Sequence, residues 1–303
     1  MALSYLFSGQ GSQFAEMGQD LYKSEPIYKQ TIDEASDVLG LDFKDAKVFD
    51  DPKNVQTAIV TMSTGLFRLL NTELPHPMGA TGLSLGEYSA LIAAGSVDFA
   101  AALKLVQDRS GYMAQAGAKH PGKMAAVLNA DPGILHTALV EASKVGEVYP
   151  ANYNTDQQVV IGGSAAGVKA AHNYLKDHGV RRVIPLKVAV ASHTPLMQSA
   201  SDALGKRLQS VEFMQPVFPV ISNTTGEEFN VLDIKVILTK QLIKPTHFEK
   251  CVQKLSDLGT DTFIELGPGK TLTKLAKKNV KQADAYHVDS VASLNELREK
   301  LSD

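Results

Sequence analysis

The order of short apolar runs and helical stretches changes at one place in this sequence, and the change limits the folds open to it. Outside residues 122–188, strand-like runs such as "LSYLF" and "DTFIEL" alternate with helical periodicity. Such alternation is typical of a mostly parallel sheet with helices on both faces. Within 122–188 the pattern instead predicts strand, helix, strand, strand, helix, strand, which is the ferredoxin-like order. We therefore predict an α/β fold in which residues 1–121 and 189–303 form a parallel-sheet domain and residues 122–188 form an inserted α+β subdomain.

Bulk composition excludes several classes of protein. The 303 residues carry a formal charge of −3, so no basic surface predicts binding to nucleic acid. A single cysteine, Cys251, rules out an internal disulfide framework and a multi-cysteine zinc site, and it suits a reducing cytosol. No stretch approaches the roughly 18 apolar residues of a membrane span, and the N-terminal run is too short for a secretory signal. We predict a cytoplasmic protein.

The stretch "TGLSLGEYSAL" places Ser84 between two glycines, after one strand-like run and before a helix. This is the context of a nucleophile elbow, in which a strained turn exposes the serine hydroxyl. The next residue, Leu85, can then offer its backbone N–H to an oxyanion at the helix N-terminus. The same spacing also suits a plain strand-to-helix turn that needs small residues for steric reasons. From the spacing alone both interpretations stay open.

A serine nucleophile needs a base, and histidine is the usual one near neutral pH. The chain has eight histidines, and the sequence alone leaves several of them as candidates. His193 precedes Thr194-Pro195, a plausible helix start, where the positive end of the helix dipole favours a neutral imidazole. Arg109, in "VQDRSGYMAQ", is either an ordinary solvated arginine or a buried cation able to grip a carboxylate with two hydrogen bonds.

Five blocks, in order, resemble motifs of the malonyl-CoA:acyl-carrier-protein transacylases. They are "FSGQGSQ", "GLSLGEYSAL", "ANYNTDQQVVIGG", "SHTPLM" and "ELGPGKTLTKL", and together they extend over nearly the whole chain. The resemblance implies an α/β-hydrolase-like domain with a ferredoxin-like insert, in agreement with the pattern of elements. "ELGPGKT" is not a phosphate-binding loop, because Ile264 stands where that motif requires its first glycine.

The resemblance also assigns roles to individual residues. It implies that Ser84 is the nucleophile and His193 its general base, and that Arg109 binds the malonyl carboxylate. The backbone N–H groups of Gln10 and Leu85 would hold the oxyanion. The backbone carbonyl of His247 would orient the base.

The chain departs from the family pattern at two pocket positions. Leu83 replaces a histidine found in many members, and Ser192 replaces a phenylalanine common in malonyl-specific relatives. Neither change removes a catalytic group, but both bear on the acyl groups that the pocket accepts. Asn152 and Asn154 resemble asparagines near the family's active-site mouth, although asparagines that shape a hairpin are equally consistent with the sequence.

The activity that the resemblance implies is transfer of a malonyl group from malonyl-CoA to the phosphopantetheine thiol of holo-acyl carrier protein, through a malonyl-serine, for fatty acid synthesis. This chemistry is expected to need no metal and no cofactor. One alternative is the same chemistry in a stand-alone acyltransferase of a polyketide assembly line. Another is a serine acyl hydrolase, against which Arg109 argues, because clearing varied acyl chains needs no carboxylate clamp. A third alternative is a non-catalytic module that binds the carrier protein. We expect a monomer with no membrane partner.

Overall fold

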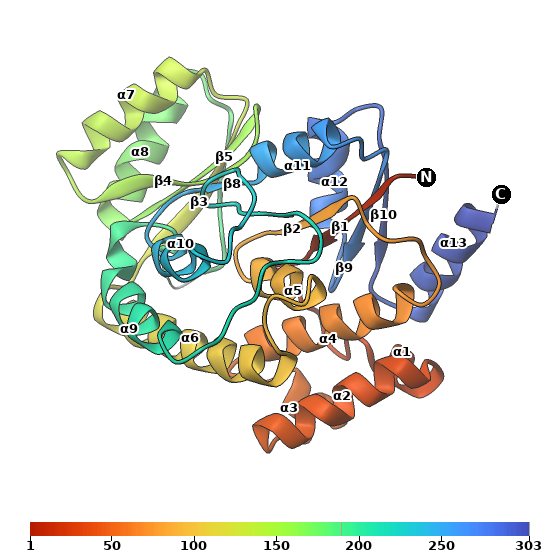
Figure 1. Cartoon of the computed structure of the whole chain (residues 1–303). Helices are drawn as coiled ribbons and strands as arrows, with labels where there is room; N and C mark the ends of the chain where they lie inside the picture. Colours follow the sequence, from red (N-terminus) through yellow and green to blue (C-terminus); the bar gives the residue numbers. More distant parts are fainter. Residues whose placement is uncertain (189, 303) are drawn as a thin grey trace. The chain divides into compact units, whose positions relative to one another are not determined.

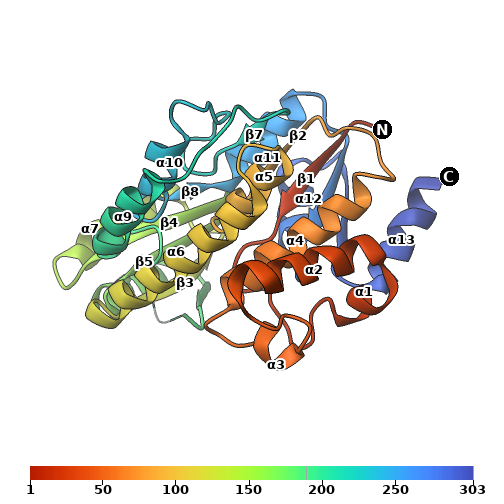
Figure 2. The same cartoon turned by 60° about the horizontal axis from the view of Figure 1, so that its bottom comes forward.

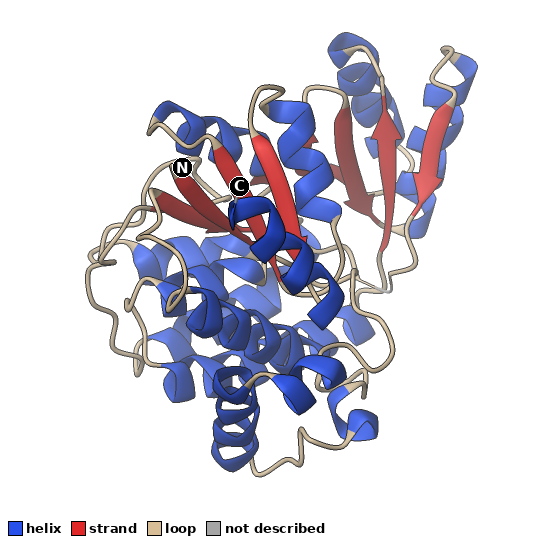
Figure 3. Cartoon of the chain, turned by 90° about the vertical axis from the view of Figure 1, so that its right-hand side faces the viewer, coloured by secondary structure: helices blue, strands red, loops and turns tan. Residues whose placement is uncertain are grey.

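Two sheets organise the chain in this computed structural model, which describes residues 1–188 and 190–302. The strands are red in Figure 3. The chain divides into two compact units. The first comprises Met1–Asp108, Val211–Ile234 and Lys250–Asp303, and the second comprises Arg109–Ser210 and Lys235–Glu249.

The first unit contains a five-stranded parallel sheet in the order β10-β9-β1-β2-β7. Its strands are β1 (Leu3–Phe7), β2 (Gly79–Gly82), β7 (Val220–Ile221), β9 (Thr262–Leu266) and β10 (Asp284–Val288). β1 and β9 are buried along their whole length, including the polar side chains of Ser4, Thr262 and Glu265. Parallel strands all end at the same edge of the sheet, so the loops that follow β1 and β2 lie next to each other.

The helices of the first unit pack against this sheet or against neighbouring helices. They are α1 (Gln19–Ser24), α2 (Pro26–Leu39), α3 (Ala46–Phe49), α4 (Val55–Leu70), α5 (Gly86–Ala93), α12 (Thr271–Asn279) and α13 (Val291–Ser302). Two further helices, α6 (Phe99–Lys119) and α11 (Phe248–Asp257), cross the limits between the units. α4 is buried on nearly every side because it lies between the sheet and α2 (Figures 1 and 2).

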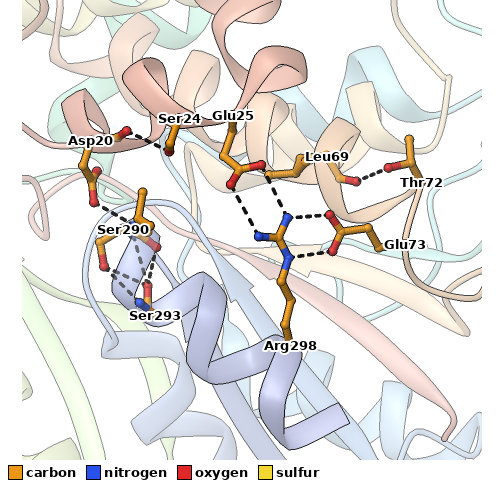
Figure 4. A network of polar contacts seen from close by, with 10 residues as sticks. Asp20, Ser24, Glu25, Leu69, Thr72, Glu73, Ser290, Ser293 and Arg298 are labelled. Atoms are coloured by element: carbon orange, nitrogen blue, oxygen red, sulfur yellow. Dashed lines mark hydrogen bonds and ion pairs between the residues drawn. The ribbon is translucent and has the colours of Figure 1, made fainter. Parts of the chain in front are cut away.

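The C-terminal helix α13 packs against its own unit through a charged contact. Arg298 donates hydrogen bonds to Glu73 at 2.6 and 3.0 Å and to Glu25 at 3.4 Å (Figure 4). At the start of the same helix, the Val291 N–H donates to the carboxylate of Asp20 at 2.7 Å. These contacts attach both ends of α13 to the rest of its unit.

The second unit contains a sheet in the order β6-β3-β5-β4-β8. Its strands are β3 (Lys123–Leu128), β4 (Val148–Thr155), β5 (Gln158–Gly163), β6 (Arg182–Pro185) and β8 (Thr246–His247). The helices of this unit are α7 (Pro132–Ser143), α8 (Ala165–Asp177), the 3₁₀ turn η1 (Pro195–Met197), α9 (Gln198–Leu208) and, from its second residue, α10 (Ile234–Gln241). α7 and α8 cover one face through a cluster that includes Val127, Leu135, Ile161 and Leu175.

The predicted fold class is confirmed. β3, α7, β4, β5, α8 and β6 follow the expected ferredoxin-like order, and the helix expected near Pro195 begins there as η1. One feature differs from the sequence interpretation: β8 extends the second sheet from outside residues 122–188. It pairs in parallel with β4, with Asn152 opposite Thr246. In the described part of the chain, no helix combines the length and the apolar character that crossing a membrane requires.

Candidate active site

Ser84 lies in a sharp turn between β2 and α5. Its φ is +53°, a left-handed conformation that few residues other than glycine adopt. The Leu83 N–H donates to the Phe7 carbonyl at 3.2 Å, and the Glu87 N–H donates to the Ser84 carbonyl at 3.1 Å. The turn is thus anchored to β1 on one side and continues into α5 on the other. A non-glycine residue in this conformation is strained, and such strain is concentrated at functional sites.

The two glycines that flank Ser84 are required by close packing. A Cβ placed on Gly82 would lie 2.0 Å from the carbonyl carbon of Gly86. A Cβ on Gly86 would lie 2.0 Å from the Phe7 carbonyl oxygen. Both distances are far below van der Waals contact, so only hydrogen fits at either position. The steric interpretation therefore accounts for the glycines, whereas the positive φ of Ser84 needs a further reason.

Gln10 and Leu85 follow neighbouring parallel strands at the same distance. Phe7 ends β1 opposite Gly82, which ends β2, and each of the two residues comes three positions later. Their turns are in contact, since a Cβ on Gly9 would lie 2.5 Å from the Leu83 carbonyl oxygen. Within residues 1–188 and 190–302, neither the Gln10 nor the Leu85 N–H donates a hydrogen bond. Two backbone donors are thus available at the sheet edge where Ser84 lies.

His193 is buried in the second unit, with 4% of its surface exposed, and its φ is +64°. Its backbone N–H donates to the Leu242 carbonyl at 2.9 Å, and its ring Nδ1 lies 2.7 Å from the Gln241 carbonyl oxygen. Because a carbonyl oxygen only accepts, Nδ1 carries the proton in the neutral ring. The lone pair of the neutral imidazole is then on Nε2, the form that a general base requires.

Burial lowers the pKa of His193 from its ordinary value to about 4. The positive charge of Arg109 lowers this pKa further, while the backbone oxygens of Gln241 and Lys244 act in the opposite direction. Desolvation outweighs the hydrogen bonds, so the imidazole is neutral at pH 7.

The expectation that the His247 carbonyl orients His193 is wrong. Nδ1 bonds instead to the carbonyl of Gln241, the last residue of α10. The carbonyls in the final turn of a helix have no acceptor role within that helix and so bond to other groups. His247 lies in β8, beside Tyr153 of β4. Its ring stacks on the Tyr153 ring with centroids 4.9 Å apart, and its Nδ1 lies 3.2 Å from the Glu249 carboxylate.

Arg109 is also buried, with 1% of its surface exposed, on α6. Its Nη2 donates to the side-chain oxygen of Gln241 at 3.1 Å. Gln241 therefore contacts both predicted residues, Arg109 through its side chain and His193 through its backbone. A neutral amide oxygen accepts a hydrogen bond from the guanidinium without adding a negative charge beside it.

Gln241 was missed in the sequence, although a signal was present. Ile234, Ile237 and Leu238 form the buried stripe of α10, and Gln241 occupies the next position of that stripe. A fully buried glutamine on an apolar helix face must hydrogen-bond to other buried groups.

The residues predicted near the mouth have structural contacts. The Asn152 amide donates to the Thr246 hydroxyl at 2.8 Å and so connects β4 to β8, and Asn154 is buried in the same strand. Leu83 and Ser192 are half-buried beside the proposed nucleophile and base. The structure thus brings His193, Arg109 and Gln241 together in the second unit, and Gln10, Ser84 and Leu85 to one sheet edge in the first.

Comparison with known proteins identifies the family. The acyl transferase domain matches residues 4–301. This chain belongs to the acyl transferase domain family. A relative from Bacillus subtilis (strain 168), named malonyl CoA-acyl carrier protein transacylase, is 38% identical over 284 residues, which are 91% of this chain and 90% of that protein.

Solved structures of acyl transferases agree with this assignment. MCAT from Streptococcus pneumoniae is 40% identical, with a TM-score of 0.94 over 98% of this chain and 99% of that one. A malonyl-transacylase in complex with its type II PKS acyl-carrier protein is 34% identical, with a TM-score of 0.92 over 99% and 100% of the two chains. These likenesses extend over the strand-turn-helix of Ser84 and over the His193 segment alike.

Proposed function

We propose that this acyl transferase moves a malonyl group from malonyl-CoA to the phosphopantetheine thiol of holo-acyl carrier protein, for fatty acid synthesis. The similarity of nearly the whole chain to relatives named malonyl CoA-acyl carrier protein transacylase carries the proposal. The strained Ser84 and the buried Arg109 support it in chemical terms. We further propose that the enzyme acts as a monomer in the cytoplasm.

The reaction proceeds in two transfers through one covalent intermediate. His193 takes the proton of the Ser84 hydroxyl, and the oxygen attacks the thioester carbonyl of malonyl-CoA. The backbone N–H groups of Gln10 and Leu85 hold the oxyanion, and it collapses with loss of the CoA thiol, which takes up the proton from His193. The carrier-protein thiol then attacks the malonyl-serine, with His193 again accepting a proton and returning it to Ser84.

Arg109 accounts for the choice of acyl group. A malonyl group ends in a carboxylate, which a guanidinium binds with two charge-assisted hydrogen bonds. An acetyl group has no carboxylate to form these hydrogen bonds, so its transition state gains less stabilisation than that of a malonyl group. This argument also disfavours a serine acyl hydrolase, which needs no clamp for a carboxylate. The relative solved with a type II PKS carrier keeps the polyketide carrier as the second candidate acceptor.

Intact-protein mass spectrometry after brief mixing with malonyl-CoA tests the nucleophile. The wild type is expected to gain a malonyl adduct and Ser84→Ala to gain none. Ser89→Ala, the same change in a buried serine of α5, is the matched control and should be acylated normally. A malonyl adduct on Ser84→Ala would refute the central assignment.

Two further measurements separate the proposal from its rivals. Adding holo-acyl carrier protein to the adduct should transfer the malonyl group, whereas a hydrolase would release malonate into water. Arg109→Met should lose the preference for malonyl-CoA over acetyl-CoA, while Arg68→Met, which removes a half-buried arginine paired with Glu34, should keep it. Unchanged preference in Arg109→Met would contradict the clamp.

A further inference from the structure

Two buried polar side chains flank the Ser84 turn and have no part in the chemistry described above. Asn223 and Glu87 are both 0% exposed. Asn223 comes two residues after β7, the strand that pairs with β2 through Thr81 and Ile221. It therefore lies beside the loop that leaves β2, although it is far from Ser84 in the sequence.

The contacts of these two side chains join one side of the turn to the other. The Asn223 side-chain amide donates to the Gly82 carbonyl at 2.7 Å, and its backbone N–H donates to the Glu87 carboxylate at 2.5 Å. The Glu87 N–H in turn donates to the Ser84 carbonyl at 3.1 Å. A chain of hydrogen bonds thus runs from the residue two positions before Ser84 to the carbonyl of Ser84 itself.

Asn223 contributes a donor and nothing else from its side chain. Its amide oxygen is buried and has no hydrogen-bond partner among the residues that the structure describes. Burying an acceptor without a partner is unfavourable, and a leucine of similar size would avoid that cost. The contact that offsets the cost is the one to Gly82, at the entrance to the turn.

A strained turn persists only when the surrounding structure holds it in place. Ser84 has a φ of +53°, and its flanking glycines supply room for the turn rather than a force that maintains it. We propose that Asn223 and Glu87 are positioning residues that hold Ser84 in its reactive conformation. The inference rests on the proposed function insofar as Ser84 is the nucleophile.

Labelling of Ser84 by an uncharged fluorophosphonate tests this role without using malonyl-CoA. Asn223→Leu is expected to slow labelling by about ten- to hundredfold, because a misplacement of order 1 Å costs about that much. In malonyl transfer the same variant should lower kcat and leave KM nearly unchanged, since no substrate contact is lost. Thr260→Val is the matched control: it removes a buried hydroxyl that bonds to Ser4 and does not touch the turn.

A second pair of variants decides the question even if Asn223→Leu does not fold. Glu87→Gln keeps an acceptor oxygen at nearly the same volume and should be labelled at close to the wild-type rate. Glu87→Met removes the acceptor at a similar volume and should be slow. Equal rates for these two would overturn the proposal, and so would a slowing of Thr260→Val that matches that of Asn223→Leu.

Failure of the proposed function gives a different result. If the wild type is labelled at Ser84 but gains no malonyl adduct, the proposed malonyl transfer is wrong. The labelling rates of the variants still test the positioning role in that case. If wild-type Ser84 resists the fluorophosphonate altogether, the turn is not a reactive elbow and the inference is wrong.

Discussion

The pH dependence of Ser84 reactivity provides a direct test of the buried imidazole. With a pKa of about 4, His193 is about 90% neutral at pH 5, whereas a histidine with the ordinary value near 6.5 would be only about 3% neutral. Since only the neutral ring accepts the serine proton, the two cases differ about thirtyfold in rate at pH 5. We expect the rate to stay nearly constant from pH 7 to pH 5 and to fall toward pH 4.

The assay must report on His193 alone. Malonyl-CoA is unsuitable, because its own carboxylate takes up a proton at low pH and weakens binding to Arg109. Labelling of Ser84 by an uncharged fluorophosphonate avoids this difficulty, and mass spectrometry counts the labelled fraction. Because the charge of Arg109 lowers the pKa of His193, the labelling rate of Arg109→Met should begin to fall at a higher pH than that of the wild type. A wild-type labelling rate that falls to half its maximum near pH 6.5 would refute the argument from burial.

Stability should depend on the same proton. The pKa of His193 is lower in the folded chain than in the unfolded one, so between pH 6.5 and 4 the unfolded chain binds a proton that the folded chain does not. The free energy of unfolding should therefore fall as the pH drops through this window, by up to about 3 kcal/mol from this group. His193→Gln should weaken that dependence, as measured by denaturant titration at several pH values.

Three further predictions concern single side chains. Gln241→Met should raise KM for malonyl-CoA by about tenfold or more, because a hydrogen bond to a charged group is worth about 1.5–3 kcal/mol; an unchanged KM would contradict the link to the clamp. Gly86→Ala should destabilise the protein in thermal unfolding, whereas Gly111→Ala, where a Cβ meets nothing within 4 Å, should stabilise it by about 0.5–1 kcal/mol. Arg298→Ala should lower the free energy of unfolding by only about 1 kcal/mol at low salt, because water screens its partly exposed ion pairs. Removing the more exposed Lys144–Glu141 ion pair should leave the free energy of unfolding almost unchanged.

The sequence predicted the local conformation of the candidate site at the two places where neighbouring residues decide it. The spacing of glycines around Ser84 and the helix start after His193 are local features, and the structure shows the turn and the 3₁₀ turn that they indicate. Whether Arg109 is buried could not be decided from an amphipathic helix pattern, because the pattern does not say what covers each face. In the structure Arg109 is 1% exposed.

The error at His247 shows the limit of motif reasoning. Motif matching placed the orienting carbonyl at His247, whereas the structure places it at Gln241, because any residue has a carbonyl and the sequence carries no record of its direction. The end of α10 decides the matter, since the carbonyl of Gln241, in the last turn of that helix, accepts from the His193 ring. The side chain of the same residue reaches Arg109 for a separate reason, its position on the buried stripe of the helix.

By itself the sequence determined the alternation of strands and helices, the ferredoxin-like order within residues 122–188, the two glycines that the turn requires, and the residue types available for acyl transfer. These follow from periodicity and from steric rules that act over a few residues. Only the tertiary structure decided which distant groups meet: Asn223 with Gly82, Gln241 with both Arg109 and His193, and β8 with the second sheet. Burial has the same origin, because the pKa of His193 depends on how much water the surrounding elements exclude, and no single segment carries that information.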